Sequence, residues 1–319
     1  MAAHFRYAVY GLAVRCNQPL PAAPSAHDGP VDLDIDIPAT PARSLDWDGP
    51  EPVYAGQESF WQLDDHTWRL GYTDPVSGAR WDLTCERGAR MTVRWMEGIS
   101  FPDVRTFVLN SAIPVALHLR GIPCLHASGI VVNGRGALFL GASGTGKSTT
   151  AAAMVAAGNE LLTDDVAALD LRADQVLVRP GLPRVRLLAE SAAAVNESFD
   201  LLAPVWSDAS FSAKRYLDAP GGGGAARLGV IYLLARREAE PREPSVTPLA
   251  PREALRWLME HTCGKVWLDA PRRARLFQSL ARVTEMVPVR TVHRGDRLAD
   301  LPKLVELLSE DAGVVTSRC

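Results

Sequence analysis

The sequence contains little cysteine and has no disulfide framework. Its five cysteines, among 319 residues, are scattered without a C-x-x-C pair. An odd number of unpatterned cysteines is typical of reduced thiols inside the cell, and not of a disulfide scaffold. We therefore predict a cytoplasmic protein without a metal site built on cysteine.

Long apolar runs and long basic runs are also missing. No stretch of about 18 apolar residues occurs, so no membrane span is expected. The N-terminal segment MAAHFRYAVYGLAVR lacks the uninterrupted apolar core of a signal peptide. The formal net charge is −3 and no lysine or arginine run is long, which gives no electrostatic footprint for nucleic acid. We expect neither a membrane nor a nucleic acid as partner.

The first hundred residues have the pattern of β-structure. Residues 31–37, VDLDIDI, alternate strictly between apolar and acidic side chains, which favours a half-buried strand over a calcium-binding loop. Residues 59–72 and 80–95 each read as a hairpin. Residues 103–120 then predict a helix, with Asp103 as a possible cap and with Pro114 kinking or splitting it.

The second half alternates strands and helices. Residues 122–143 contain two short apolar runs joined by NGRG, which predicts a hairpin, and residues 227–236 predict a buried strand. Helical spacing follows near the end, around a strand-like segment at 287–294. This alternation predicts an α/β fold. We divide the chain into an N-terminal β-rich domain, 1–120, that ends in a helical linker, and an α/β catalytic domain, 121–319.

A glycine-rich motif, GASGTGKS, fits the phosphate-binding pattern G-x-x-x-x-G-K-[ST] in full. It stands between an apolar run and an alanine-rich stretch, as a strand, loop and helix require. Glycines let successive N–H groups face one anion, and the helix expected over 147–157 directs its positive end at phosphates. Lys147 is predicted to reach the β- and γ-phosphate oxygens, and Ser148 to offer its hydroxyl to Mg²⁺. The predicted nucleotide-binding residues are Gly141, Ser143, Gly144, Thr145, Gly146, Lys147, Ser148 and Thr149.

Two consecutive aspartates, Asp164 and Asp165, follow this motif. A helix of about 11 residues rises about 16 Å, and the strand expected at 160–164 returns about 16 Å. Both carboxylates should therefore lie level with the loop, on a neighbouring strand. One can hold Mg²⁺ through water, and the other can take the proton of an acceptor hydroxyl.

His126 is a third candidate. It lies at the start of the hairpin strand that precedes the glycine-rich loop. Strand pairing brings it towards the phosphates or away from them, depending on the register. From spacing alone, a core histidine and a site residue remain equally open.

Together these residues resemble the catalytic domain of HPr kinase/phosphorylase. The resemblance lies in His126-Ala127-Ser128-Gly129, in the loop Gly141–Ser148 and in Thr163-Asp164-Asp165. It implies an α/β P-loop kinase core like that of HPr kinase and phosphoenolpyruvate carboxykinase, acting with ATP and Mg²⁺ on a protein serine. It further implies that Asp164 is the general base, that Asp165 and Ser148 serve Mg²⁺, and that His126 lines the site.

The N-terminal half looks unlike the regulatory domain of that family. It instead resembles HPr-kinase-like proteins encoded with lasso-peptide enzymes, some of which phosphorylate a serine of the precursor peptide. This second resemblance implies a lasso-type, ribosomally made precursor peptide as the acceptor. Relatives of HPr kinase often form hexamers, so a homo-oligomer is a further implied partner.

Four cations are candidates for contacts to the substrate or to phosphate. Lys214 and Arg215 lie in the polar segment FSAKRYLD, where they could clamp a phosphate or an acidic peptide terminus. Arg184 and Arg186 flank Val185 and would share one strand face. An exposed surface cation is the alternative reading for each of them.

Three functions remain open. A Mg·ATP-dependent kinase of a peptide or protein serine is favoured, because an N-terminal domain of about 100 residues exceeds what a small acceptor needs. A small-molecule kinase on the same scaffold and a non-catalytic nucleotide-sensing module are the alternatives. A GTPase fits less well, since the sequence has no N-K-x-D motif for reading the base.

Overall fold

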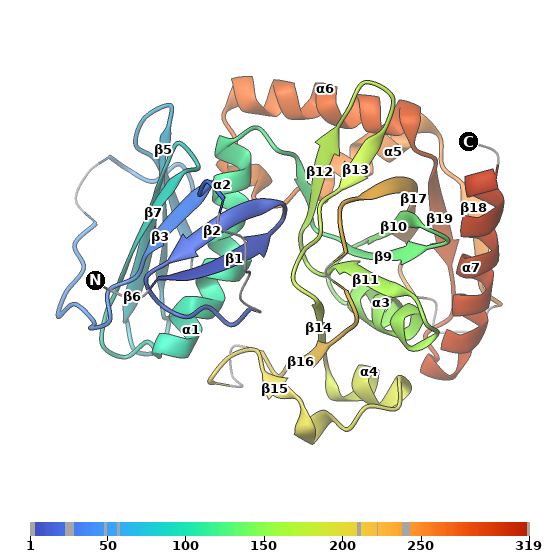
Figure 1. The fold of residues 1–319 in the computed structure, drawn as a ribbon, viewed down its shortest axis with the longest axis horizontal. Coiled ribbons are helices and arrows are strands. Elements are labelled where there is room, and N and C mark those ends of the chain that lie inside the picture. The colour runs from blue at the N-terminus through green and yellow to red at the C-terminus, as the bar shows by residue number, and fades with distance from the viewer. Residues whose placement is uncertain are drawn as a thin grey trace. The chain divides into compact units, whose positions relative to one another are not determined.

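The computed structural model describes residues 4–22, 29–47, 50–55, 58–208, 212–221, 223–237 and 243–317. They form two compact units (Figure 1). The first comprises Met1–Ile122 and Gly264–Arg272, and the second comprises Pro123–Cys263 and Arg273–Cys319. The segment 264–272, which the sequence analysis assigned to the catalytic domain, thus belongs to the first unit.

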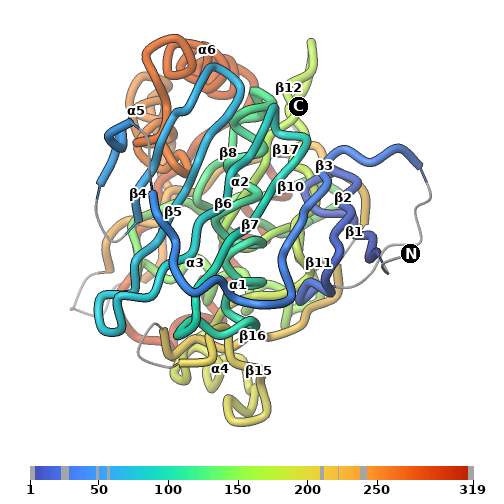
Figure 2. Tube along the Cα trace, turned by 90° about the vertical axis from the view of Figure 1, so that its left-hand side faces the viewer, coloured from blue at the N-terminus to red at the C-terminus, as the bar shows by residue number. Residues whose placement is uncertain are grey.

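The first unit contains a seven-stranded sheet, whose strands run side by side in Figure 2. Both predicted hairpins and the predicted strand at 31–37 are confirmed. On that strand Leu33, Ile35 and Ile37 are at most 1 % exposed, because period-2 alternation turns them all to the buried face. The strand order is β1 (Phe5–Val9), β2 (Leu12–Cys16), β3 (Leu33–Asp36), β7 (Arg90–Trp95), β6 (Arg80–Glu86), β5 (Thr67–Thr73) and β4 (Glu58–Gln62).

A helical segment packs in this unit against buried aromatic side chains of the sheet. It consists of α1 (Phe101–Phe107), a π-helical turn (Val108–Ala112) and α2 (Ile113–Leu119). The π turn ends two residues before Pro114, where the helix was expected to kink or split. The predicted cap was wrong: the side chain of Ser100, not of Asp103, caps α1, by accepting a hydrogen bond from the Asp103 N–H.

The second unit is α/β, as predicted, and is built on a nine-stranded sheet. β10 pairs in parallel with β17, which pairs in parallel with β19. On the other side of β10, β9 is antiparallel to both β10 and β11, so β11 runs in the same direction as β10. The strands are β8 (Cys124–Leu125), β9 (Ser128–Val132), β10 (Arg135–Leu140), β11 (Glu160–Thr163), β12 (Ala167–Leu171), β13 (Val176–Val178), β17 (Ala226–Leu234), β18 (Ser245–Pro248) and β19 (Val289–His293).

A three-stranded sheet and five helices complete the part of this unit that the structure describes. Alanines of α3 pack beside Phe139 and Tyr232 of the sheet and beside Leu304 and Leu308 of α7, in one buried core. The sheet order is β14 (Arg184–Leu187), β16 (Arg215–Asp218) and β15 (Ala203–Pro204). The helices are α3 (Lys147–Ala156), α4 (Ala189–Ala194), α5 (Pro251–Glu260), α6 (Ala270–Met286), which begins in the first unit, and α7 (Leu301–Ser317), with short 3₁₀ turns at Phe199–Leu201 and Leu298–Asp300. A third 3₁₀ turn, Lys265–Trp267, belongs to the first unit.

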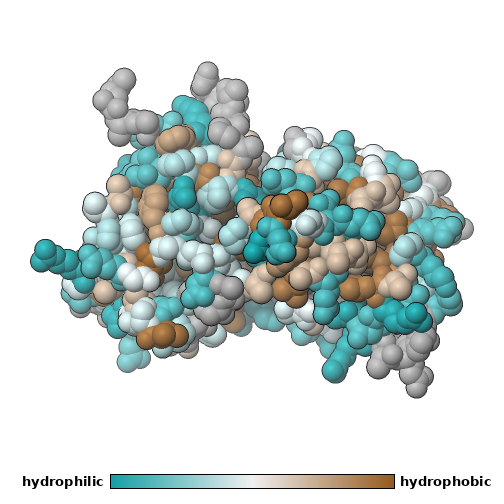
Figure 3. All heavy atoms as spheres, turned by 90° about the horizontal axis from the view of Figure 1, so that it is seen from below, coloured by the Kyte–Doolittle hydropathy of each residue, from teal (hydrophilic) through white to brown (hydrophobic). Residues whose placement is uncertain are grey.

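Hydrophilic and hydrophobic side chains are interspersed on the face that Figure 3 shows. No helix within the described part of the chain is long and apolar enough to cross a membrane.

Candidate functional site

A cavity of about 290 Å³ opens in the second unit, at the carboxyl ends of its parallel strands. Four strands, β11, β10, β17 and β19, end at this edge of the sheet. The segments that follow each of them contribute lining residues. Open α/β sheets bind ligands at this edge, where strand ends leave room between the connecting loops.

The glycine-rich loop connects β10 to α3 and forms one wall of the cavity. Gly141 must be glycine, because a Cβ there would lie 2.7 Å from the Thr145 hydroxyl and 2.9 Å from the Leu234 carbonyl. Gly146 is the N-cap of α3 in a left-handed conformation, with φ of 94°. The first turn of α3 leaves N–H groups without partners inside the helix, so it favours an anion. Of the predicted nucleotide-binding residues, Gly141 does not line the cavity. The others do: Ser143, Gly144, Thr145, Gly146, Lys147, Ser148 and Thr149.

Lys147 lies across this loop. Its ammonium donates hydrogen bonds to the carbonyl oxygens of Gly141, at 2.9 Å, and Ala142, at 3.3 Å. The residue is 7 % exposed, and burial lowers the pKa of its side chain. A bound anion would offset this cost, because a negative charge stabilises the protonated form.

Asp164 comes directly after β11, and its carboxylate accepts three hydrogen bonds. One oxygen accepts hydrogen bonds from the hydroxyls of Ser128, at 2.6 Å, and Ser148, at 2.9 Å. The other accepts from the backbone N–H of Arg186, at 3.0 Å. The sequence analysis placed the aspartates on a strand next to the loop, but β9 lies between β11 and β10. Asp164 reaches Ser148 across that intervening strand.

Asp165 has different partners. Its backbone is left-handed, with φ of 74°, a conformation that is strained for a residue other than glycine. Its carboxylate forms an ion pair with Arg186. The Nδ1 atom of His126 lies 3.2 Å from the carboxylate and 3.0 Å from the carbonyl oxygen of Asp165. The structure thus places His126 in the cavity, beside the second aspartate.

The surroundings of His126 favour its neutral form. Partial burial, together with the charges of Lys147 and Arg186, lowers its pKa to about 4. Because Nδ1 faces two acceptor oxygens of Asp165, we assign the proton of the neutral ring to Nδ1. The Nε2 atom is then an acceptor.

The oxygen atoms beside the glycine-rich loop are suitable ligands for Mg²⁺. The Ser148 hydroxyl and the Asp164 carboxylate lie next to each other, as oxygen ligands must. Within the described residues, no group of three or more histidines, cysteines, aspartates or glutamates could hold a metal ion alone. Mg²⁺ commonly uses one or two protein oxygens and completes its shell with water and phosphate oxygens. The residues present therefore fit a nucleotide-borne Mg²⁺.

Two of the four candidate cations line the cavity. Arg186 and Lys214 are both part of the lining, and burial, followed by the charge of Arg186, lowers the pKa of Lys214. Arg184 instead lies over the ring of Tyr216, with its Cζ atom 4.6 Å from the ring centroid. Arg215 donates to the backbone carbonyls of residues 199, 200 and 202. The structure therefore brings Arg186 and Lys214 to the site and leaves Arg184 and Arg215 outside it.

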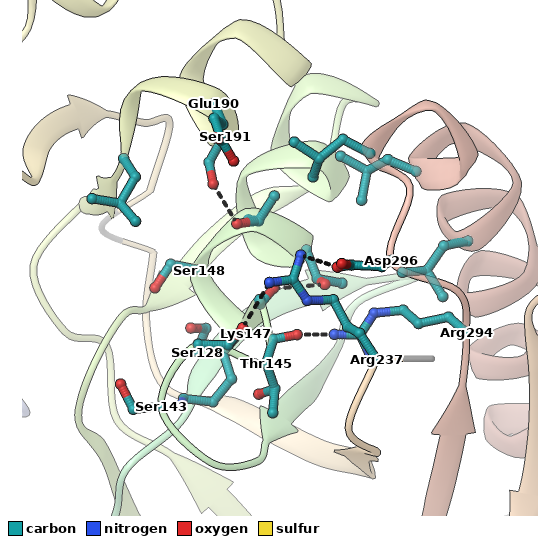
Figure 4. A pocket seen from close by; sticks show the side chains of 18 of the residues that line it. Ser128, Ser143, Thr145, Lys147, Ser148, Glu190, Ser191, Arg237, Arg294 and Asp296 are labelled. Atoms are coloured by element: carbon teal, nitrogen blue, oxygen red, sulfur yellow. Dashed lines mark hydrogen bonds and ion pairs between the residues drawn. The ribbon is translucent and has the colours of Figure 1, made fainter. Parts of the chain in front are cut away.

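The sequence analysis missed a second group of charged residues, which follows β17 and β19. Arg294 is 8 % exposed and donates to the carbonyl oxygen of Thr145. Burial, reinforced by the nearby charge of Arg237, lowers the pKa of Arg294 to about 10. Arg237 donates to the carbonyl oxygen of Gly144 and pairs with Asp296 at 2.7 Å (Figure 4). The signal that would have revealed these residues is their position after two buried strands of a parallel sheet.

Comparisons with known proteins leave the family open. No protein-family model and no curated protein matches the chain. Among solved structures, the chain is similar to the Hpr(Ser) kinase/phosphatase from Coxiella burnetii, at 13 % sequence identity and a TM-score of 0.32. That alignment covers 59 % of this chain and 95 % of the other. The assignment of a function therefore depends on the geometry of the cavity.

Proposed function

We propose that this protein is a kinase that uses Mg·ATP and transfers the γ-phosphoryl group to a hydroxyl. One observation carries the proposal: the ammonium-bearing glycine-rich loop, the Ser148 hydroxyl and the Asp164 carboxylate converge on one cavity. Phosphoryl transfer needs this combination, because positioning and charge neutralisation supply most of its catalysis.

The phosphates lie against the loop and the first turn of α3. Lys147 turns from the loop carbonyls towards the β- and γ-phosphate oxygens. The hydrogen bond between Ser148 and Asp164 favours this pair as protein ligands of Mg²⁺. Mg²⁺ supplies charge neutralisation on the phosphates when bound. This assignment exchanges the aspartate roles implied by the resemblance to HPr kinase, in which Asp165 serves the metal.

The acceptor hydroxyl arrives beside Asp165. Its oxygen forms a bond to the γ-phosphorus while the bond from that phosphorus to the bridging oxygen breaks and ADP leaves. The hydroxyl proton passes to the Asp165 carboxylate, which Arg186 and His126 hold in place. We assign Asp164 to the metal and not to the proton, because its carboxylate accepts from the Ser148 hydroxyl at the glycine-rich loop.

We take the acceptor to be a serine of a peptide or protein, with a lasso-type precursor peptide as the first candidate. Arg186 and Lys214 support an acceptor that brings negative charge, such as a peptide carboxyl terminus. A small-molecule acceptor is the competing reading. Phosphoamino-acid analysis separates the two after incubation with γ-labelled ATP: phosphoserine in a peptide supports our proposal, and label only in a small metabolite contradicts it.

The central test is Lys147→Ala. Removing the ammonium should lower the transfer rate by about 10³-fold or more, a loss of about 4 kcal/mol of transition-state stabilisation. Lys303→Ala is the matched control, because Lys303 is an exposed lysine of the same unit that pairs with Glu243 outside the cavity. Its rate should not change. Equal transfer rates for wild type and Lys147→Ala would reject the site. Wild type that binds nucleotide but transfers no phosphoryl group would be a nucleotide-sensing module.

A further inference from the structure

The cavity extends well past the residues that the proposed reaction uses. Its lining continues from the glycine-rich loop along residues 294–298, which connect β19 to α7, and onto Leu301 and Leu304 of α7. Pro244 and Arg237 also contribute. We call this part the α7 side of the cavity.

Strand order places the α7 side opposite the aspartates. The loop follows β10, whereas Asp164 follows β11, two strands away in one direction. Arg294 follows β19, two strands away in the other direction. At about 4.8 Å per strand, each group lies about 10 Å to its own side of the loop. A ligand whose phosphates rest on the loop therefore points one end at the aspartates and its other end at α7.

This inference rests on the proposed function, which assigns the reacting γ-phosphate to the aspartate end. The remainder of a nucleoside triphosphate is its nucleoside. Because the phosphate chain lies on the loop, the nucleoside must leave it towards β17 and β19.

The chemistry of the α7 side suits a nucleoside. Leu298 begins the 3₁₀ turn Leu298–Asp300 and Leu301 begins α7 directly after it, and both leucines line the cavity. A flat base gains most from such a surface. Asp296 stands at its rim with 55 % of its side chain exposed, which leaves carboxylate oxygen available for a further donor.

The rim is also fixed relative to the loop. Arg237 connects the two, since it donates to the Gly144 carbonyl and pairs with Asp296 (Figure 4). Arg294 holds the adjacent Thr145 carbonyl. The N–H groups of Thr145 and Gly146 follow these two carbonyls. Each N–H points away from the arginine that binds the carbonyl before it, because the peptide unit is planar and trans. These arginines are therefore positioning residues that orient the loop and Asp296 together.

We infer that the α7 side of the cavity is the nucleoside subsite of the phosphoryl donor, with the base against Leu298 and Leu301 and the ribose hydroxyls donating to Asp296.

Calorimetric titration of two ligands tests the subsite. Wild type is titrated with a non-hydrolysable ATP analogue and with inorganic tripolyphosphate, each with Mg²⁺. Leu298→Gln keeps the size of the side chain but removes its apolar surface. We expect it to weaken binding of the ATP analogue at least about tenfold and to leave tripolyphosphate binding unchanged. Leu201→Gln is the control, since Leu201 is 86 % exposed in the same unit and outside the lining, and neither affinity should change.

The outcomes separate this inference from the proposed function. If wild type binds neither ligand, the proposed kinase function fails, and the inference fails with it. If wild type binds both, but Leu298→Gln weakens neither or weakens both equally, the nucleoside subsite alone is rejected.

The ribose contact has its own test, which does not depend on how a leucine variant folds. Wild type should bind ATP about tenfold more tightly than 2′,3′-dideoxy-ATP, which lacks both ribose hydroxyls. Asp296→Asn should remove most of that preference while tripolyphosphate binding remains. Equal wild-type affinities for the two nucleotides would overturn the role of Asp296.

Discussion

Each unit of the molecule contains an aspartate held by an arginine, and the two pairs differ in their surroundings. In the first unit, Asp82 of β6 faces Arg94 across the sheet and is 1 % exposed. Its oxygens accept from Arg94 at 2.6 and 3.0 Å and from the Trp47 indole at 3.1 Å. This carboxylate is fully occupied by protein donors within a regular sheet.

In the second unit, Asp165 stands beyond the end of a strand. Its backbone is left-handed and its side chain is 28 % exposed towards a cavity. An ion pair with an arginine is therefore common to both sites, with Arg94 in the first unit and Arg186 in the second, but of these two aspartates only Asp165 faces a cavity. The comparison teaches that an aspartate–arginine pair alone does not identify a functional site, and that the strand end and the cavity do.

The largest expected effects come from the second unit. Asp165→Asn should lower the transfer rate about 10²- to 10³-fold while nucleotide binding is retained, as expected when a general base is lost. Asp164→Asn should instead weaken Mg²⁺-dependent nucleotide binding, because it removes a carboxylate next to Ser148. Steady-state kinetics and calorimetry with and without Mg²⁺ measure both effects. The reverse pattern would return the two aspartates to the roles implied by HPr kinase.

A smaller effect, on stability, is expected in the first unit. Asp82→Ala leaves the Arg94 and Trp47 donors without their acceptor. Because 40 % of the Arg94 side chain is exposed and can be rehydrated, the free energy of unfolding should fall by about 2 kcal/mol, measured by urea denaturation. Asp34→Ala is the matched control, because Asp34 pairs with Arg15 at the surface, where both side chains are more than a third exposed. It should cost less than about 1 kcal/mol. Similar losses of unfolding free energy for the two variants would show that the burial of Asp82 does not matter.

The sequence predicted local structure well wherever one period dominates. The strand at 31–37 and the hairpins follow from alternation, because a slip of one residue would expose a whole apolar face. The cap of α1 failed for a local reason. Ser100 and Asp103 are both good capping residues, and the spacing S-x-x-D resembles a capping box that begins at the serine.

The common level of the loop and the aspartates was predictable because these parts are close in sequence. The glycine-rich loop and the aspartates are joined by one helix and one strand, so element lengths brought them to one level. Arg237 and Arg294 lie about 90 and 150 residues beyond the loop. Only the order β10, β17, β19 in the sheet places them beside it, and neither spacing nor composition reveals that order.

The smallest expected effect concerns His126, whose pKa of about 4 lies below the usual value of about 6.5. Unfolded chains bind a proton at this histidine below about pH 6.5, but folded chains do so only near pH 4. The free energy of unfolding should therefore fall as the pH drops through this window. We expect a loss of about 1 kcal/mol, since the side chain is 41 % exposed and water offsets part of the burial. His126→Gln removes this contribution, while carboxylates elsewhere titrate alike in both proteins. The stability difference between wild type and His126→Gln should be constant above pH 7 and shrink towards pH 4; a difference independent of pH would show that His126 titrates normally and is not held neutral beside Lys147 and Arg186.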